Sequence, residues 1–109
     1  MKSHQAVDLK WIIDERWKEI RTTGRNVDSG KISIGEACQT IIENVGVICE
    51  ITDLHPRLWH SIGDWGLRGF CISKNSKEQA EWTDFLNRLD KIMPERVKEM
   101  TQKDIENLP

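Results

Sequence analysis

Four of the six cysteine and histidine side chains in this 109-residue sequence, the kinds that bind zinc, lie between positions 49 and 71: Cys49, His55, His60 and Cys71. Cysteine thiolate and histidine imidazole are preferred zinc ligands, and four of them can complete a tetrahedral site. None of the intervals between them is a C-x-x-C or H-x-x-x-H pair, which would place two ligands on one turn. We therefore predict that the protein holds no metal and no other cofactor. The alternative is a metal-binding or small-ligand-binding regulator that uses the region from His55 to Cys71.

A second segment partly matches a metal-binding motif. Residues 25–36 resemble the twelve-residue EF-hand calcium loop, because Gly30 stands at its sixth position and Glu36 at its twelfth. The first and third positions, where that family has carboxylates, are Arg25 and Val27. An arginine would place a cation beside the metal, so we interpret the segment as a polar loop between two helices.

The sequence contains no arrangement that predicts catalysis. A nucleophilic cysteine needs a histidine within hydrogen-bonding distance, and none of the three cysteines lies in a recognised catalytic signature. Glu36, Glu43 and Glu50 recur at seven-residue intervals. On a helix, successive members stand about 10 Å apart, which is too far for two carboxylates to share a proton. We therefore predict that the protein is not an enzyme.

The same three glutamates form a surface feature, which we call the acidic ridge. No Lys or Arg occurs between Ile32 and Pro56, so the sequence offers the ridge no cation nearby. On a helix the ridge lies opposite an apolar seam and is expected to face solvent. The seam consists of Ile34, Cys38, Ile41, Val45 and Ile48.

Tryptophan is frequent in this chain, with five residues and no tyrosine. Trp17, Trp59 and Trp82 fall on the apolar faces of predicted helices, so we expect them to be shielded in a single core. Trp11 falls opposite the apolar stripe of its helix, and Trp65 is less clearly internal. Because tryptophan is enriched in binding hot spots, these two are candidate partner-binding residues. Burial of Trp11 by a helix later in the chain is the open alternative.

Composition and charge argue against several classes of protein. The formal net charge is −2 and Lys and Arg are spread along the chain, without the basic patch that binds nucleic acid. No apolar run approaches the ~20 residues that span a bilayer, and residues 1–5 lack the apolar core of a signal peptide. The odd number of cysteines favours free thiols in a reducing compartment. We expect a cytoplasmic protein that is not in a membrane.

Apolar periodicity and capping residues predict helices over most of the chain. The first helix covers residues 7–23, with Gly24 at its C-terminal cap and a polar loop over residues 24–30. The second starts at a capping pair, a serine followed three residues later by Glu36. The predicted starts of the later elements are Ser33, Pro56, Ser76, Pro94 and Thr101.

Two stretches are ambiguous between helix and strand. Residues 47–52 are rich in β-branched side chains, and residues 67–73 follow or include three glycines, Gly63, Gly66 and Gly69, that weaken a helix. We predict a mainly α fold, a compact bundle of four to five helices, in which these two stretches could be short strands. The length of the chain predicts a single domain over residues 1–109.

Together these features favour a non-catalytic protein–protein interaction module, such as an inhibitor, immunity protein or adaptor. It would dock a basic protein partner through the acidic ridge. The predicted partner-binding residues are Trp11, Glu36, Glu43, Glu50 and Trp65. A third class, a nucleic-acid-associated protein, would need a basic patch assembled from distant positions. Those positions are Arg57, Arg68, Lys74 and Lys77.

Overall fold

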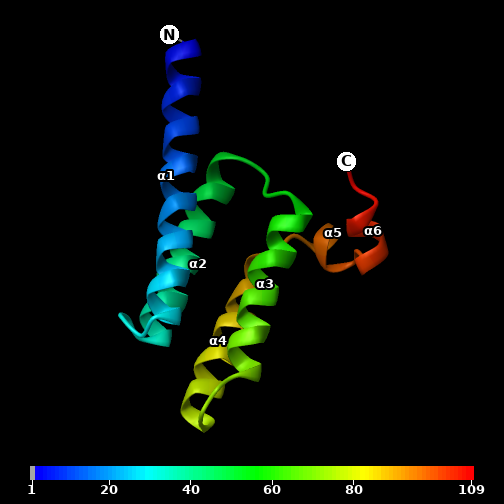
Figure 1. The fold of residues 1–109 in the computed structure, drawn as a ribbon. Coiled ribbons are helices and arrows are strands. Elements are labelled where there is room, and N and C mark those ends of the chain that lie inside the picture. The colour runs from blue at the N-terminus through cyan, green and yellow to red at the C-terminus, as the bar shows by residue number, and fades with distance from the viewer. Residues whose placement is uncertain (1) are drawn as a thin grey trace. The chain divides into compact units, whose positions relative to one another are not determined.

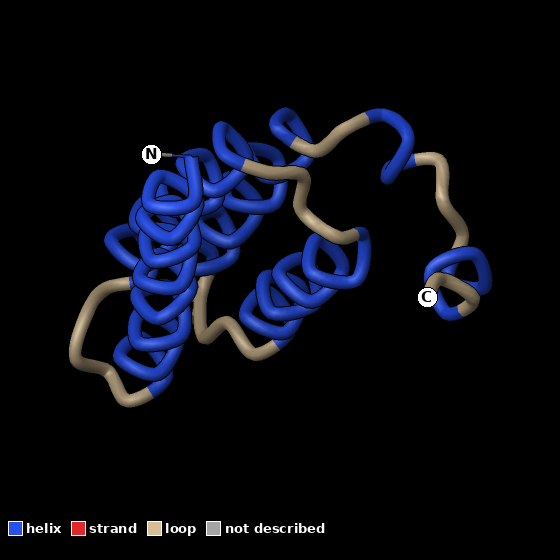
Figure 2. The backbone as a smooth tube through the Cα atoms, turned by 90° about the horizontal axis from the view of Figure 1, so that it is seen from above, coloured by secondary structure: helices blue, strands red, loops and turns tan. Residues whose placement is uncertain are grey.

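The protein is mainly α, as predicted, and 79 % of it is helical. The computed structural model describes residues 2–109, and side chains from Leu9 onward. Within residues 2–109 the helices are α1 (Lys2–Asp28), α2 (Ile34–Ile51), α3 (Pro56–Cys71), α4 (Ser76–Ile92), α5 (Glu95–Lys98) and α6 (Gln102–Glu106) (Figure 1). Figure 2 shows helices joined by loops, and the described chain contains no strand over residues 47–52 or 67–73.

The contacts divide the chain into two compact units, Met1–Asp53 and Leu54–Pro109. The N-terminal unit contains α1 and α2, and the C-terminal unit contains α3 to α6. Trp17 is half-buried in the first unit, whereas Trp59 and Trp82 are buried in the second. The single domain over residues 1–109, with a single core, therefore stays a prediction.

α1 is longer than the sequence predicted. It continues through Gly24 and ends at Asp28. The packed face of the helix explains this extension, because it continues past Ile20 and the buried Thr23 to the half-buried Val27. The chain turns at Gly30, whose φ of 77° lies in the left-handed region that glycine adopts without a steric penalty. The predicted cap at Gly24 is wrong, and the first four positions of the calcium-loop resemblance, residues 25–28, belong to α1.

α2 begins where the capping signal predicted. The Ser33 hydroxyl accepts a hydrogen bond from the Glu36 N–H at 3.2 Å. The helix continues through residues 47–51 because Ile48, on the same seam as Ile41, is fully buried against the rest of the unit. α1 and α2 lie side by side and antiparallel (Figure 1). The buried residues of the pair are Ile20, Thr23, Ala37, Cys38, Ile41, Asn44, Val45 and Ile48.

One polar contact fixes how α1 and α2 are aligned along their axes. Arg16 Nη1 donates to Asn44 Oδ1 at 3.3 Å, and Asn44 Nδ2 donates to the Thr40 carbonyl at 2.8 Å. Asn44 is only 2 % exposed, so leaving its amide unpaired would be destabilising. The contact places Arg16 level with Asn44 in the antiparallel pair.

α3 begins at Pro56, as predicted. His55 Nδ1 accepts a hydrogen bond from the Arg57 N–H at 3.1 Å and caps the helix. Trp59, one turn further on, is 1 % exposed. Its indole N–H has no hydrogen-bond partner among the described residues, so packing alone holds the ring.

The glycines of α3 do not end the helix, contrary to the sequence prediction. A Cβ at Gly66 would lie 2.8 Å from side-chain atoms of Phe85 and Leu86, and one at Gly69 would lie under 3.0 Å from the Trp82 indole. These two glycines therefore allow close approach between α3 and α4, which lie side by side (Figure 1). The packing outweighs the intrinsic helix cost of about 1 kcal/mol for each glycine.

α4 starts with a cap one residue before the predicted Ser76. Asn75 Oδ1 accepts from the Glu78 N–H at 2.9 Å, and Glu78 Oε1 accepts from the Lys74 N–H at 2.9 Å. Its buried face is Trp82, Phe85 and Leu89, of which Trp82 was predicted from the sequence to face the core.

The last two helices follow the predicted starts. Pro94 is the N-cap of α5, and Thr101 forms a reciprocal capping box with Asp104 at the start of α6. Arg57 of α3 holds the end of the chain, because its guanidinium donates to three backbone carbonyls. The acceptors are the carbonyl oxygens of Ile105, Glu106 and Leu108.

Candidate functional site

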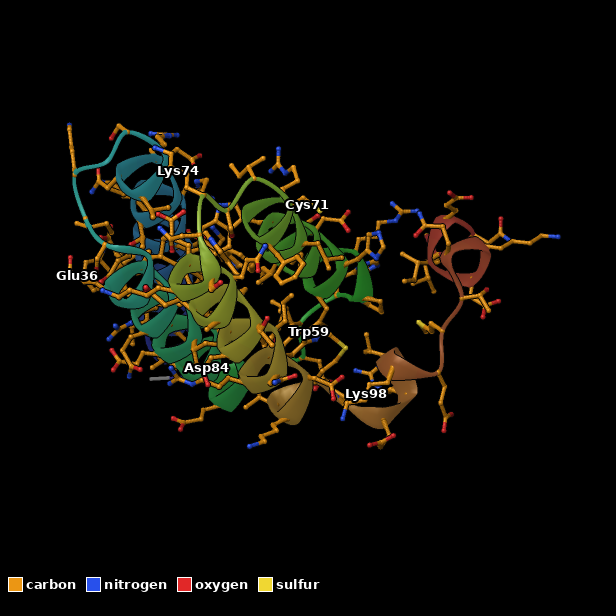
Figure 3. All side chains as sticks on the ribbon, turned by 90° about the horizontal axis from the view of Figure 1, so that it is seen from below. Glu36, Trp59, Cys71, Lys74, Asp84 and Lys98 are labelled. Carbon is orange, nitrogen blue, oxygen red and sulfur yellow. The ribbon has the colours of Figure 1, made fainter. Side chains whose placement is uncertain are left out.

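The acidic ridge lies on the outer face of α2. Glu36, Glu43 and Glu50 are all exposed, as predicted, and Figure 3 shows Glu36 near the start of the helix. The Glu43 carboxylate accepts a hydrogen bond from Gln39 Nε2 at 2.6 Å. Among the described side chains, no Lys, Arg or His forms an ion pair with any of the three glutamates. The ridge is therefore a row of three exposed charges that no side chain from residue 9 onward neutralises by an ion pair.

Trp11 is exposed on α1 and is not buried by a later helix, which was the alternative that the sequence left open. It retains 64 % of its surface accessible to solvent. Trp11 lies nine residues before the buried Ile20, and at about 100° per residue this places it on the opposite side of the helix, away from α2. The acidic ridge, by the same argument, lies on the side of α2 away from α1.

Trp11 and the acidic ridge therefore occupy opposite outer faces of the α1–α2 pair. The sequence predicted that one partner contacts both. Two packed helices are about 20 Å across, since each is about 10 Å in diameter, so a single flat partner surface does not reach both faces.

A row of residues on the outer face of α1 was missed in the sequence. Lys18 and Arg25 follow Trp11 at seven-residue intervals, and all three are exposed. We call Trp11, Lys18 and Arg25 the α1 row. Neither cation forms an ion pair with a described side chain, whereas Lys10 pairs with Asp14 at 3.1 Å. The sequence did contain a signal for this row, because its members recur at the same seven-residue interval as those of the acidic ridge.

Trp65, the remaining predicted partner-binding residue, lies in the C-terminal unit. It is half-buried and meets Trp82 and Phe85 edge to face, with ring centroids 4.8 and 5.4 Å apart. These ring contacts pack α3 on α4. Trp65 is also partly exposed, and its role in partner binding stays a prediction.

The structure does not bring the candidate metal ligands together. His55 caps the start of α3 and Cys71 ends it, so about 24 Å of helix lies between them. Figure 3 shows Cys71 at that end, and His60 pairs with Asp64 at 3.3 Å. Cys49 belongs to the other unit. Among the described residues, no group of three or more Cys, His, Asp or Glu side chains could hold a metal ion.

The environment of Cys49 lowers its reactivity. Partial burial raises the pKa of the Cys49 thiol, and the negative charge of Asp53 raises it further. Because the thiolate is the reactive form, Cys49 is a poor nucleophile at neutral pH. Cys38 is buried, which also disfavours a catalytic role.

We predict that Asp53→Asn speeds alkylation of Cys49 near neutral pH. The substitution removes the repulsion between the carboxylate and the thiolate and so lowers the thiol pKa. Burial remains, so the pKa stays above its ordinary value. The measurement is the iodoacetamide rate of the Cys49 peptide against pH, read by mass spectrometry. An unchanged midpoint for Asp53→Asn would show that the Asp53 charge does not act on this thiol.

Comparison with protein-family models, with curated proteins and with solved structures found no match for this chain. Within the described residues, no helix combines the length and the apolar character needed to cross a membrane. The function is therefore inferred from the residues and their geometry.

Proposed function

We propose that this protein is a non-catalytic interaction module that docks a basic protein surface on the acidic ridge of α2. The observation that carries this proposal is the exposure of Glu36, Glu43 and Glu50 in one row, with no cation of the described side chains paired to them. Opposite charges across an interface steer the encounter and exclude wrong partners. A row about 20 Å long suits a partner element that presents cations at a similar spacing, such as a helix.

Other features support a binding role over an enzymatic one. The raised pKa of Cys49 disfavours nucleophilic chemistry, and His55 and Cys71, two of the residues considered as alternative metal ligands, lie at opposite ends of α3. A cytoplasmic location remains part of the proposal. It is supported by three cysteines that are all free thiols.

We predict that replacing Glu36, Glu43 and Glu50 together by glutamine slows association with the partner. Charges at an exposed interface act mainly on the encounter rate, so we expect about a tenfold loss of association rate at low salt and a flatter salt dependence. The free energy of unfolding should change by less than about 0.5 kcal/mol per site, with slightly more at Glu36, which lies in the first turn of α2. The measurement is binding kinetics with the protein that co-purifies from the native host.

The matched control replaces glutamates outside α2, at positions 81, 99 and 106, by glutamine. It changes the net charge by the same three units and leaves the acidic ridge intact. If both triple variants lose association rate equally, the effect comes from net charge and the ridge is not a docking surface.

A further inference from the structure

The acidic ridge and the α1 row match in spacing as well as in charge. Each has three members at seven-residue intervals along a helix, so neighbours in both rows stand about 10 Å apart. One row carries three negative charges, and the other carries a tryptophan and two positive charges. They lie on opposite outer faces of the same helix pair, so they cannot meet within one molecule.

The alignment of α1 and α2 brings the two rows to the same height. The turn at Gly30, midway between Arg16 and Asn44 in the sequence, and the hydrogen bond between these two side chains place them at about the same height, and the helices are antiparallel (Figure 1). Two residues further along α1 is Lys18, which is level with Ile42, one residue from Glu43. The offset of one residue, about 1.5 Å, is the same for every member of the row. The pairs that come level are Lys18 with Glu43, Arg25 with Glu36, and Trp11 with Glu50.

A sideways translation of one α1–α2 pair onto another therefore places the α1 row of one copy against the acidic ridge of the next. Two ion pairs form, Lys18 with Glu43 and Arg25 with Glu36, and Trp11 comes level with Glu50 at the last turn of α2.

Gly46 lies between Glu43 and Glu50 on the same outer face of α2. A Cβ built at Gly46 meets nothing within 4 Å in the chain, so internal packing does not require a glycine there. Glycine in a helix is unfavourable, so its presence is consistent with close approach by another molecule. Glu15, an acidic residue beside the α1 row, comes level with this same uncharged Gly46 and therefore opposes no glutamate directly.

We propose that the partner docked by the acidic ridge is α1 of a second copy of this chain, an inference that rests on the proposed function. The interface is heterologous: the α2 face of one copy covers the α1 face of the next. Each added copy leaves one acidic and one basic face free, so the assembly does not stop at a dimer. It would cover Trp11, which is otherwise a large apolar side chain in water.

A charge-reversal experiment on the full chain tests this proposal. The two variants are Lys18→Glu and Glu43→Lys, which lie away from the helix ends and are exposed, so both should fold. Sedimentation equilibrium of the wild type should show an average mass that rises with concentration. Each variant alone should self-associate about tenfold more weakly, because like charges then face each other. An equimolar mixture, and the double variant, should recover association because each contains an opposite pair.

Three outcomes would overturn the proposal: a wild type that stays monomeric at every concentration, variants that associate like the wild type, or a mixture that fails to recover. A monomeric wild type would leave the proposed function intact if the glutamine triple variant still lost a partner from the native host. If the wild type is monomeric and the glutamine triple variant also loses no partner from the native host, the proposed function is contradicted as well.

Gly46→Ala provides a second readout of the same interface. The added methyl group stands where α1 of the second copy would approach α2 and should weaken self-association several-fold while leaving the fold intact. Gly63→Ala, at a helix glycine in the other unit that also has free space, is the matched control and should associate like the wild type. Equal association by both variants would show that α1 of a second copy does not approach α2 at Gly46.

Discussion

Gly69→Ala is expected to lower the free energy of unfolding by about 2 kcal/mol. A Cβ at this position would lie under 3.0 Å from several atoms of the Trp82 indole, which is 6 % exposed and therefore has little room to move. Overpacking of this kind typically costs about 1–3 kcal/mol. The severe overlap places this substitution in the upper part of that range, and the higher helix propensity of alanine offsets up to about 1 kcal/mol. Chemical denaturation of the variant and the wild type measures the difference.

Gly63→Ala is the control for Gly69→Ala. Both glycines lie in α3, and nothing lies within 4 Å of a Cβ at Gly63. Only the gain in helix propensity applies there, so stability should rise by up to about 1 kcal/mol. If the two substitutions change stability in the same direction, the close packing of α3 on α4 is not what Gly69 provides.

Trp11→Ala is expected to have the largest effect on binding and almost none on folding. Removing an aromatic hot spot typically costs about 2 kcal/mol or more, which corresponds to roughly a thirtyfold loss of affinity, mostly through faster dissociation. Trp11 is 64 % exposed, so the free energy of unfolding should change by less than about 0.5 kcal/mol. Sedimentation equilibrium and thermal melting of one preparation give both values.

Ile72→Ala is the matched control for Trp11→Ala. Ile72 is 77 % exposed and lies in the C-terminal unit, outside both rows. It removes an exposed apolar side chain without touching the proposed interface, so association should stay unchanged. A large drop in stability for Trp11→Ala, or an equal loss of association for Ile72→Ala, would contradict the assignment of Trp11 to an interface.

Local signals in the sequence predicted the helices well. The starts at Ser33, Pro56 and Thr101 were correct because a side-chain cap or a proline acts within three or four residues of itself. The apolar seam of α2 and the exposure of the acidic ridge were also correct. Both depend only on the helical period.

The errors occur where packing between helices outweighs local preference. Gly24 was predicted to cap the first helix, and the three glycines of α3 were predicted to weaken the helix before residues 67–73. Gly24 lies on a face that continues against α2, and Gly69 provides space for Trp82. Over residues 47–52, where a strand was the alternative, the helix continues to Ile51 because the burial of Ile48 outweighs strand propensity. None of these contacts is visible until the partner helix is known.

The candidate site was predicted in part. The acidic ridge was found from spacing, but its opposition to Trp11 depends on which face of α1 packs against α2. The height match between the two rows depends on the turn at Gly30 and on the contact between Arg16 and Asn44, which no periodicity reveals. The sequence therefore predicted one joint surface where the structure presents two opposite faces.

The central claim is that the outer faces of α1 and α2 are binding surfaces for each other in separate copies. A dilution series of ¹⁵N-labelled protein followed by NMR tests it most directly, because each amide and each indole reports its own environment. We expect concentration-dependent shifts at the Trp11 indole and at the amides of Lys18, Glu43 and Gly46, and we expect salt to suppress them by screening the exposed charges. Shifts confined to residues 54–109, or no dependence on concentration, would contradict the claim.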